Sequence, residues 1–251
     1  MGRAFEFRKE RKFKRWGHMA KTFTKIGKEI TIAVKQGGPD VTGNPRLRAL
    51  IAEARSENMP KDNVERAIKK ALEKDQGDFK EIVYEGYGPH GIAYLVEAAT
   101  DNNTRTVANV RSYFTKCGGT LGTSGSVSFM FDHKCVFRIK DQEGLDIDEL
   151  QLELCDCDDD PEVFTEEQED QDGNVTRNIV IYGAYGSYGA IQKFIEDNGY
   201  ELVSGGFERI PNVELKDVTP EQRETLDKLT GLLEDDDDVT SVYNTMKPAE
   251  E

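Results

Sequence analysis

The sequence predicts an α+β protein in which a basic helical segment precedes two small units of mixed helices and strands. Three observations lead to this fold class. Apolar residues recur at helical spacing through the first part of the chain, the period changes to that of strands after Gly77, and the net charge reverses sign near the same point. With 251 residues, the chain is long enough for two or three compact units.

Three amphipathic helices are expected in residues 21–75, after a tail formed by residues 1–20. The apolar stripe of the first helix stops at Gly37-Gly38-Pro39, which cannot continue it. The second helix opens at Asn44-Pro45, a side-chain cap followed by a proline suited to the first turn, and the third opens at Met59-Pro60. Because each stripe occupies one helix face and the links are short, we expect one small bundle.

Beyond Gly77 the pattern alternates between strands and helices. Helices that follow strands in this order pack on one face of a mainly antiparallel sheet. Residues 156–172 are expected to form an acidic connection, with Asp172-Gly173 as a hairpin turn. In chain order the expected elements are strands at Ile82–Tyr87 and Ile92–Ala99, a helix at Asn103–Lys116, strands at Val127–Phe131 and Cys135–Ile139, a helix at Ile147–Cys155, a strand at Asn178–Tyr182, a helix at Tyr188–Asn198, a strand at Glu201–Glu208, a helix at Pro220–Leu233 and a strand at Val239–Asn244.

The distribution of charge is more informative than its total of −15. Residues 1–75 carry 19 Lys/Arg against 10 Asp/Glu, a net charge of +9, whereas residues 76–251 carry 14 against 38, a net charge of −24. Such asymmetry indicates a basic module that faces a polyanion, attached to an acidic body. The acidic body would repel stray polyanions and confine contact to the basic face.

The first 35 residues carry the densest positive charge, with eleven Lys/Arg, and Phe5, Phe7, Phe13 and Trp16 are interleaved with them. Cations neutralise phosphates, and aromatic faces stack on unpaired bases, so this segment is expected to bind nucleic acid. Basic residues on the second and third helices and one beyond them extend the candidate surface. The candidate contacts are Arg11, Lys12, Lys14, Arg15, Trp16, Lys21, Lys25, Lys28, Lys35, Arg46, Arg48, Lys61 and Arg105. Lys21, Lys25 and Lys28 share a helix face that differs from the apolar one, so we expect them to be exposed.

Two polar clusters allow more than one interpretation. Thr100–Thr106 lies at a strand-to-helix junction, where it either caps the helix or contacts a phosphate or a partner through Arg105. The glycine-rich segment Gly118–Ser126 is read as a hairpin connector, with close approach of an RNA backbone as its alternative.

Other classes of protein receive little support. No run of residues approaches the ~20 apolar positions of a membrane span, and no apolar block follows the basic N-terminal residues as in a secretory signal, so we expect a cytoplasmic protein with no membrane partner. No P-loop, dinucleotide fingerprint or catalytic arrangement is present, which predicts no enzyme activity, no cofactor and no metal. The four cysteines are too few and too irregular for a disulfide framework.

Several motifs, taken in order, resemble the YebC family of bacterial regulators, whose mitochondrial relatives include the translational activator of cytochrome oxidase subunit one. The chain lacks the Gly-His-Ser-Lys-Trp opening usual in that family, so contacts assigned to that opening are not carried over. The motifs are Phe23-Thr-Lys-Ile-Gly-Lys-Glu-Ile30, Asn44-Pro-Arg-Leu-Arg48, Asn58-Met-Pro-Lys-Asp-Asn-Val-Glu-Arg-Ala-Ile68, Tyr84-Glu-Gly-Tyr-Gly-Pro89, Thr100-Asp-Asn102, Arg105-Thr-Val107 and Gly118-Gly-Thr-Leu-Gly-Thr-Ser-Gly-Ser-Val127.

The resemblance implies a division into three domains. Residues 1–80 would form the helical domain, residues 81–135 and 205–251 a middle α+β domain, and residues 136–204 an acidic α+β domain inserted in it. The resemblance also implies a DNA-binding transcriptional regulator. Separately, we expect the protein to be a monomer. A ribosome-associated or RNA-associated translation factor is the first alternative, and it would use the same basic surface. A protein-binding adaptor that acts through the acidic domain is the second.

Overall fold

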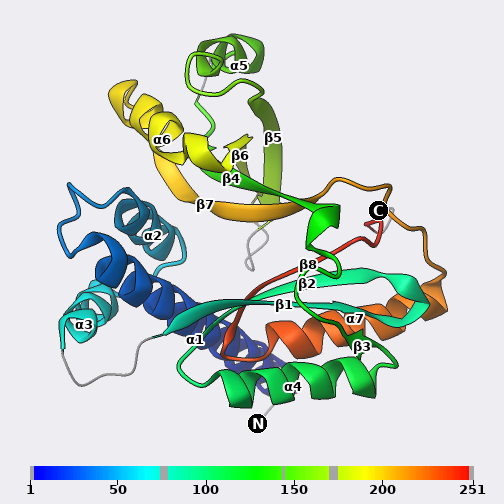
Figure 1. Cartoon of the computed structure of the whole chain (residues 1–251). Coiled ribbons are helices and arrows are strands. Elements are labelled where there is room, and N and C mark those ends of the chain that lie inside the picture. Colours follow the sequence, from blue (N-terminus) through cyan, green and yellow to red (C-terminus); the bar gives the residue numbers. More distant parts are fainter. Residues whose placement is uncertain (1–2, 74–78, 143–144, 170–174, 249–251) are drawn as a thin grey trace. The chain divides into compact units, whose positions relative to one another are not determined.

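The computed structural model describes residues 3–73, 79–142, 145–169 and 175–248, with side chains from residue 19 onward except those of residues 168–169 (Figure 1). The chain divides into two compact units. The first comprises Met1–Ile32, Met59–Met130 and Pro211–Glu251, and the second comprises Ala33–Asn58 and Phe131–Ile210. Within the described residues the strands form two four-stranded sheets, one in each unit, and this mixture of helices and antiparallel sheets confirms the α+β class.

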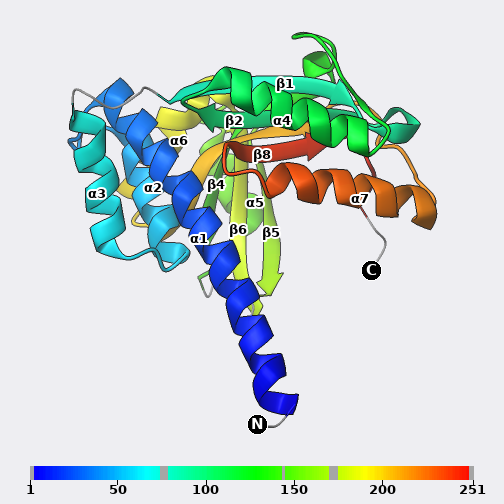
Figure 2. The same ribbon diagram turned by 90° about the horizontal axis from the view of Figure 1, so that it is seen from below.

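The sheet of the first unit contains three strands that precede residues 131–210 of the second unit in the sequence and one strand that follows them. Its order is β3-β1-β2-β8, with antiparallel pairing throughout. Two helices, α4 and α7, lie side by side on one face of this sheet (Figures 1 and 2). The elements are β1 (Lys80–Tyr87), β2 (Ala93–Thr100), α4 (Asn103–Lys116), β3 (Thr120–Leu121), α7 (Pro220–Glu234) and β8 (Val239–Asn244), with a 3-10 turn at Pro89–Gly91.

The core of the first unit lies between this sheet and its two helices. Tyr94 of β2 meets Phe114 of α4 edge to face, with 5.8 Å between ring centroids. The buried Tyr94 hydroxyl donates to the Leu226 carbonyl oxygen of α7 at 3.2 Å, so burying the ring leaves no polar group unpaired. Leu229 and Leu233 continue the same face of α7 and are fully buried.

Helix starts follow the capping signals in the sequence. The Asn44 side chain accepts from Leu47 N at the start of α2 (Pro45–Ser56), and Asn102 accepts from Arg105 N at the start of α4. Thr219 and Gln222 form a reciprocal capping box on α7. The other two helices of the N-terminal region are α1 (Arg3–Gly37) and α3 (Lys61–Leu72).

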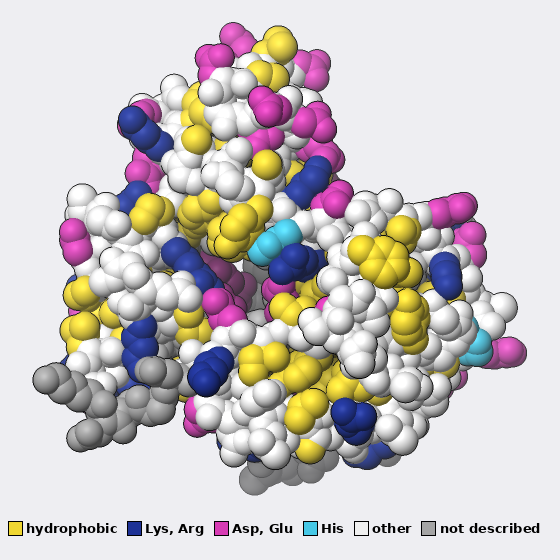
Figure 3. Space-filling model, viewed as in Figure 1, with side chains coloured by type: hydrophobic (Ala, Val, Ile, Leu, Met, Phe, Trp, Pro, Cys, Tyr) yellow, Lys and Arg dark blue, Asp and Glu magenta, His cyan; other side chains and the backbone are white. Residues whose placement is uncertain are grey.

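The second unit has the β-α-β-β-α-β element order of ferredoxin-like folds, with strand order β5-β6-β4-β7. Its core includes Phe137, Ile181 and Ile191, together with Ala49 of α2. Acidic side chains gather over α5, at the top of the view in Figure 3. The elements are β4 (Phe131–Lys140), α5 (Ile147–Leu154), β5 (Glu162–Glu169), β6 (Val175–Ala184), a 3-10 turn at Tyr185–Ser187, α6 (Tyr188–Asp197) and β7 (Leu202–Pro211).

A buried carboxylate organises the glycine-rich segment between α4 and β4. Glu85 of β1 accepts from the backbone N–H groups of Gly125, Val127 and Ser128 at 2.7–2.8 Å. Burial raises the pKa of Glu85, but these hydrogen bonds outweigh it and leave the pKa below its usual range. The segment is therefore held as a connector by the chain's own carboxylate, and it also contributes the short strand β3.

The structure corrects three expected elements. The first helix begins at Arg3, because Ala, Glu, Lys and Arg favour a helix without an apolar stripe. The strand expected at Val127–Phe131 is a 3-10 turn at Ser128–Met130, because two backbone N–H groups there bind Glu85 rather than a neighbouring strand.

The third correction is β5, which lies inside the expected acidic connection. Glu162 of this edge strand pairs with Lys134, and Glu166 pairs with Arg138 at 2.8 Å. Cations of β4 therefore neutralise two glutamates of a segment that the sequence predicts to be an acidic connection. The hairpin turn expected at Asp172-Gly173 lies outside the described residues.

The three-domain division stays a prediction. By backbone proximity, α3 and α1 up to Ile32 belong to the first unit, whereas α2 belongs to the second. Each helix in the described part of the chain is too short or too polar to span a bilayer.

We expect Glu85→Gln to lower the free energy of unfolding by about 1–3 kcal/mol, because the amide nitrogen would face backbone N–H groups that it cannot accept from. Urea denaturation measures this change. The matched control is Glu81→Gln, at an exposed position of the same strand, which should cost less than about 0.5 kcal/mol. Equal losses for the two variants would contradict the role given to Glu85.

Candidate nucleic-acid interface

The lysines predicted for α1 contact an acidic loop of their own unit. This loop, Asp235–Asp238, connects α7 to β8. Lys21 Nζ lies 2.7 Å from Asp235 Oδ1, and Lys25 Nζ donates to the Glu234 carbonyl oxygen at 2.9 Å, at the C-terminal end of α7. Burial lowers the pKa of Lys25.

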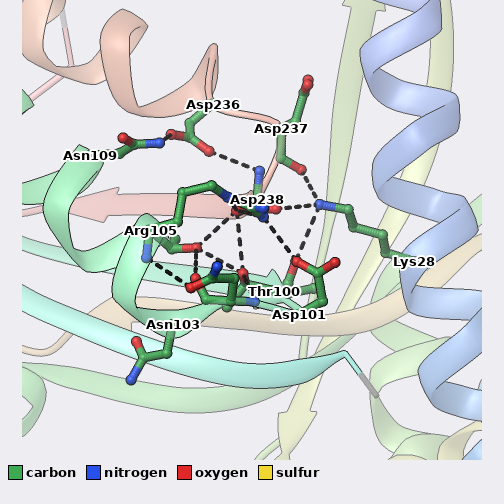
Figure 4. Close-up of polar contacts among 12 residues, drawn as sticks. Lys28, Thr100, Asp101, Asn103, Arg105, Asn109, Asp236, Asp237 and Asp238 are labelled. Atoms are coloured by element: carbon green, nitrogen blue, oxygen red, sulfur yellow. Dashed lines mark hydrogen bonds and ion pairs between the residues drawn. The ribbon is translucent and has the colours of Figure 1, made fainter. Parts of the chain in front are cut away.

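Lys28 is the most enclosed of the three. Its ammonium group donates to Asp238 Oδ1 and to the Asp237 carbonyl oxygen, both at 2.7 Å, and to the Ala99 carbonyl oxygen at 3.3 Å (Figure 4). The side chains of Lys28 and Asp238 are only 12% and 7% exposed. The expectation that this lysine face is exposed is therefore wrong for Lys28, because the acidic loop covers it.

Asp238 also satisfies the polar cluster at the start of α4. Its Oδ2 atom accepts from Arg105 Nη2 at 2.6 Å, from Thr106 Oγ1 at 2.8 Å and from Thr100 Oγ1 at 3.3 Å. Burial raises the pKa of Asp238, but the hydrogen bonds from Lys28, Arg105 and Thr106 prevail and bring the pKa to about 2. Asp238 thus stays ionised at neutral pH, and the anion next to Arg105 is a side chain of the protein.

Asp236 completes this network on its other side. Its carboxylate accepts from Asn109 Nδ2 at 3.1 Å (Figure 4) and from the Tyr113 hydroxyl at 2.9 Å. Both donors lie on α4. Burial and this hydrogen bond raise the pKa of Tyr113 to about 12. Within the described ranges, His, Cys, Asp and Glu side chains do not converge on a metal-sized site, and the carboxylates of Asp236 and Asp238 are taken up by the chain's own donors.

The other predicted contacts are scattered. Arg46 Nη1 donates to Gln36 Oε1 at 3.1 Å, and Arg48 binds Glu196 at 2.8 Å and two loop carbonyl oxygens, all within the second unit. Lys35 is exposed on α1, and Lys61 is 87% exposed at the start of α3. The remaining candidates, Arg11, Lys12, Lys14, Arg15 and Trp16, lie in α1, and their side chains are outside the described residues.

A second feature of the first unit is an open groove of about 430 Å³, which we call the α1–α3 groove. Its apolar surface includes Phe23, Met59 and Phe79, and its rim carries cations. The residues that line it are Ala20, Phe23, Thr24, Gly27, Lys28 and Thr31 of α1, Met59, Asn63, Arg66, Ala67 and Lys70 from the α3 segment, and Phe79. None of these described lining residues is acidic.

Two of the three cations that line this groove, Arg66 and Lys70, were not among the predicted contacts, whereas Lys28 was. Asn63, Arg66 and Lys70 are three and four positions apart, which places them on one face of α3, and Arg66 and Lys70 are exposed. The ammonium groups of Lys70 and Lys28 lie 5.7 and 5.5 Å from the centroid of the Phe79 ring. The spacing on α3 was visible in the sequence, but the position of Phe79 beside it depends on the fold.

Comparisons with known proteins bear on the whole chain. The family model described as "TACO1/YebC protein N-terminal domain" matches residues 3–74, and the model described as "TACO1/YebC second and third domain" matches residues 79–246. A "probable transcriptional regulatory protein" of Parabacteroides distasonis is 60% identical, with 98% of this chain and 97% of that protein aligned. A protein of the same description from Porphyromonas gingivalis is 58% identical over 100% of this chain and 99% of its own length.

A solved structure extends the likeness to the fold. The crystal structure of a conserved hypothetical protein from Aquifex aeolicus aligns with a TM-score of 0.75 and 33% sequence identity. The alignment covers 92% of this chain and 91% of that one.

We expect Lys28→Gln to lower the free energy of unfolding by about 2–4 kcal/mol, because it leaves the buried Asp238 carboxylate and two carbonyl oxygens short of a donor. Lys21→Gln removes the same charge from a pair that is 40% and 74% exposed, and it should cost less than about 1 kcal/mol. Chemical denaturation of both variants measures the difference. A Lys28→Gln variant as stable as Lys21→Gln would contradict a buried ion pair.

Proposed function

The chain belongs to the TACO1/YebC family, and on that premise we propose that it is a nucleic-acid-binding regulator of gene expression that catalyses no reaction. One observation supports this proposal most strongly: an open groove in the first unit has an apolar, aromatic floor and exposed cations at its rim. Phosphates bind such cations through charge-assisted hydrogen bonds, and bases stack on aromatic rings.

The distribution of charge along the chain supports binding of a polyanion by residues 1–75 rather than by the rest of the chain. Residues 1–75 carry a net charge of +9 and the remaining residues −24, so a polyanion is attracted to the former and repelled by the latter. Part of this positive charge is neutralised within the protein, because Lys21 and Lys28 pair with the acidic loop, which also binds Arg105. The exposed cations that line the groove are Arg66 and Lys70 of α3, and the sequence of the N-terminal part of α1 adds further Lys and Arg residues.

The relatives' names favour a role in transcription, which would act on DNA, and the apolar surface of the groove favours unpaired bases, which are typical of RNA targets. In a DNA duplex each base is stacked between its neighbours, so its faces cannot stack on an aromatic side chain. Sequence-specific RNA recognition mostly uses unpaired bases in loops and at ends. The relative affinities for duplex DNA and for structured RNA with single-stranded loops distinguish the two roles. We keep transcriptional regulation as the primary role and translation as the second candidate.

The double variant Arg66→Gln/Lys70→Gln should weaken binding of a hairpin RNA or a DNA duplex by roughly tenfold or more at low salt, an order-of-magnitude expectation for two lost phosphate contacts. For the unchanged protein, affinity should fall by roughly tenfold or more between 50 and 200 mM salt, and the double variant should show a shallower slope. Fluorescence anisotropy at several salt concentrations measures both quantities.

The control for this experiment is Lys193→Gln/Lys228→Gln, which removes the same charge from exposed positions on α6 and α7. It should leave affinity and salt slope nearly unchanged. If the control variant loses as much affinity as the α3 variant, the binding surface does not include α3.

A further inference from the structure

We propose that the α1–α3 groove receives a single unpaired nucleotide of the bound strand, with its base on the apolar floor and its phosphate at the cationic rim. This inference rests on the nucleic-acid-binding function proposed above and specifies which part of a nucleic acid the first unit recognises. The volume of the groove, about 430 Å³, falls within the range of roughly 300–1,000 Å³ typical of small-molecule sites.

The floor of the groove has the chemistry of a base-stacking site. Phe23 is only partly buried, so its ring retains surface in the groove, and the buried Met59 and Ala67 lie among the lining residues. Phe79 is also partly buried, and the ammonium groups of Lys28 and Lys70 lie over its ring, so a base on Phe79 would displace at least one of them. Aromatic rings that stay partly exposed are the usual platforms for unpaired bases. Met adapts its shape to a flat ring and makes favourable contacts with aromatic groups.

The rim supplies the polar groups that a nucleotide needs. Arg66 and Lys70 are exposed on the groove side of α3, where they can pair with a phosphate. The amide of Asn63 has both donors and an acceptor, and it can read the edge of a base. No acidic residue is present among the described lining residues, but Thr24, Lys28 and Phe79 also border a neighbouring pocket that contains Asp101 and Asp235–Asp238. The anion of a ligand would therefore lie away from these carboxylates, at Arg66 and Lys70.

Gly27 keeps the backbone of α1 accessible in this groove. A Cβ atom built at Gly27 would meet no atom within 4 Å, so packing within the protein does not require a glycine here. Glycine in the interior of a helix is destabilising relative to alanine, but it permits close approach of a ligand to the backbone. At this position the open space adjoins the floor on which the base would lie.

The occupant is an unpaired nucleotide rather than a segment of duplex. In a duplex both faces of each base are covered by its neighbours, so a base reaches a side-chain platform only when it is single-stranded or flipped out. The phosphates of a duplex could still contact Arg66 and Lys70, but the apolar floor would then remain empty.

The test fills the groove without removing charge. Gly27→Leu places a side chain in the open space, and Gly231→Leu makes the same change in α7, where a Cβ also meets nothing within 4 Å. Full-length variants are titrated by fluorescence anisotropy with a single-stranded RNA dodecamer and with an abasic strand of the same length. Thermal denaturation monitors folding.

The unchanged protein should bind the intact strand at least about fivefold more tightly than the abasic strand, since one stacked base contributes roughly 1–3 kcal/mol. Gly27→Leu should abolish this preference without altering affinity for the abasic strand, and Gly231→Leu should retain it. If Gly27→Leu does not fold, Gly27→Ala replaces it. Gly27→Ala should raise the melting temperature and still reduce the preference for the intact strand.

A Gly27→Leu or Gly27→Ala variant that folds and prefers the intact strand as the unchanged protein does would overturn the nucleotide site. Equal affinity of the unchanged protein for the two strands would also overturn it, although salt-dependent binding to both would leave the proposed function standing. Failure of the unchanged protein to bind either strand, or the hairpin RNA and DNA duplex, would overturn the proposed function and the nucleotide site together.

Discussion

The buried ion pair between Lys28 and Asp238 is the interaction on which the arrangement of the first unit depends. These residues are 210 positions apart in the sequence, and they join α1 to the connection between α7 and β8. The same carboxylate accepts from Arg105 at the start of α4, so one side chain ties three separate segments together. A buried carboxylate without these donors would incur a large desolvation penalty, and the donors would lose their anion.

This internal ion pairing determines which cations remain for a nucleic acid. Lys21 and Lys28, together with Arg105, already have carboxylate partners, and Lys25 binds a carbonyl oxygen at the end of α7. A phosphate would have to displace these partners, and for Lys28 the displacement would also expose a buried site. The exposed side chains of Arg66 and Lys70 require no such displacement. A row of lysines on one helix face is therefore a poorer guide to a binding surface than the cations left after internal pairing.

Local signals in the sequence predicted many of the elements. The caps at Asn44 and Asn102 fix the starts of α2 and α4, and the expected span of α4 agrees with the structure because its cap, apolar stripe and following glycines all agree. The edge strand β5 was missed because four of its eight residues are glutamates, and only the pairing of Glu162 with Lys134 and of Glu166 with Arg138 reveals how β4 neutralises part of this charge.

The candidate site was less predictable than the fold, because it depends on contacts between distant segments. Lys28 has the helical position expected from its spacing, yet nothing local to it indicates that Asp238 covers it. Thr100 and Arg105 allowed either a cap or an anion contact, and the structure contains both, with Asn102 as the cap and Asp238 as the anion. Phe79 carries no signal in the sequence, and its role follows from its position beside Lys70.

We propose that nucleic acid binds the first unit at the α1–α3 groove while Lys21 and Lys28 of α1 stay paired with the acidic loop. Photocrosslinking of the full chain to RNA that carries 4-thiouridine, followed by mass spectrometry of the crosslinked peptides, tests it most directly. We expect crosslinks in residues 20–31, 59–70 and at Phe79, the segments that line the groove. Crosslinks confined to residues 131–210 of the second unit, with none in the groove segments, would contradict it.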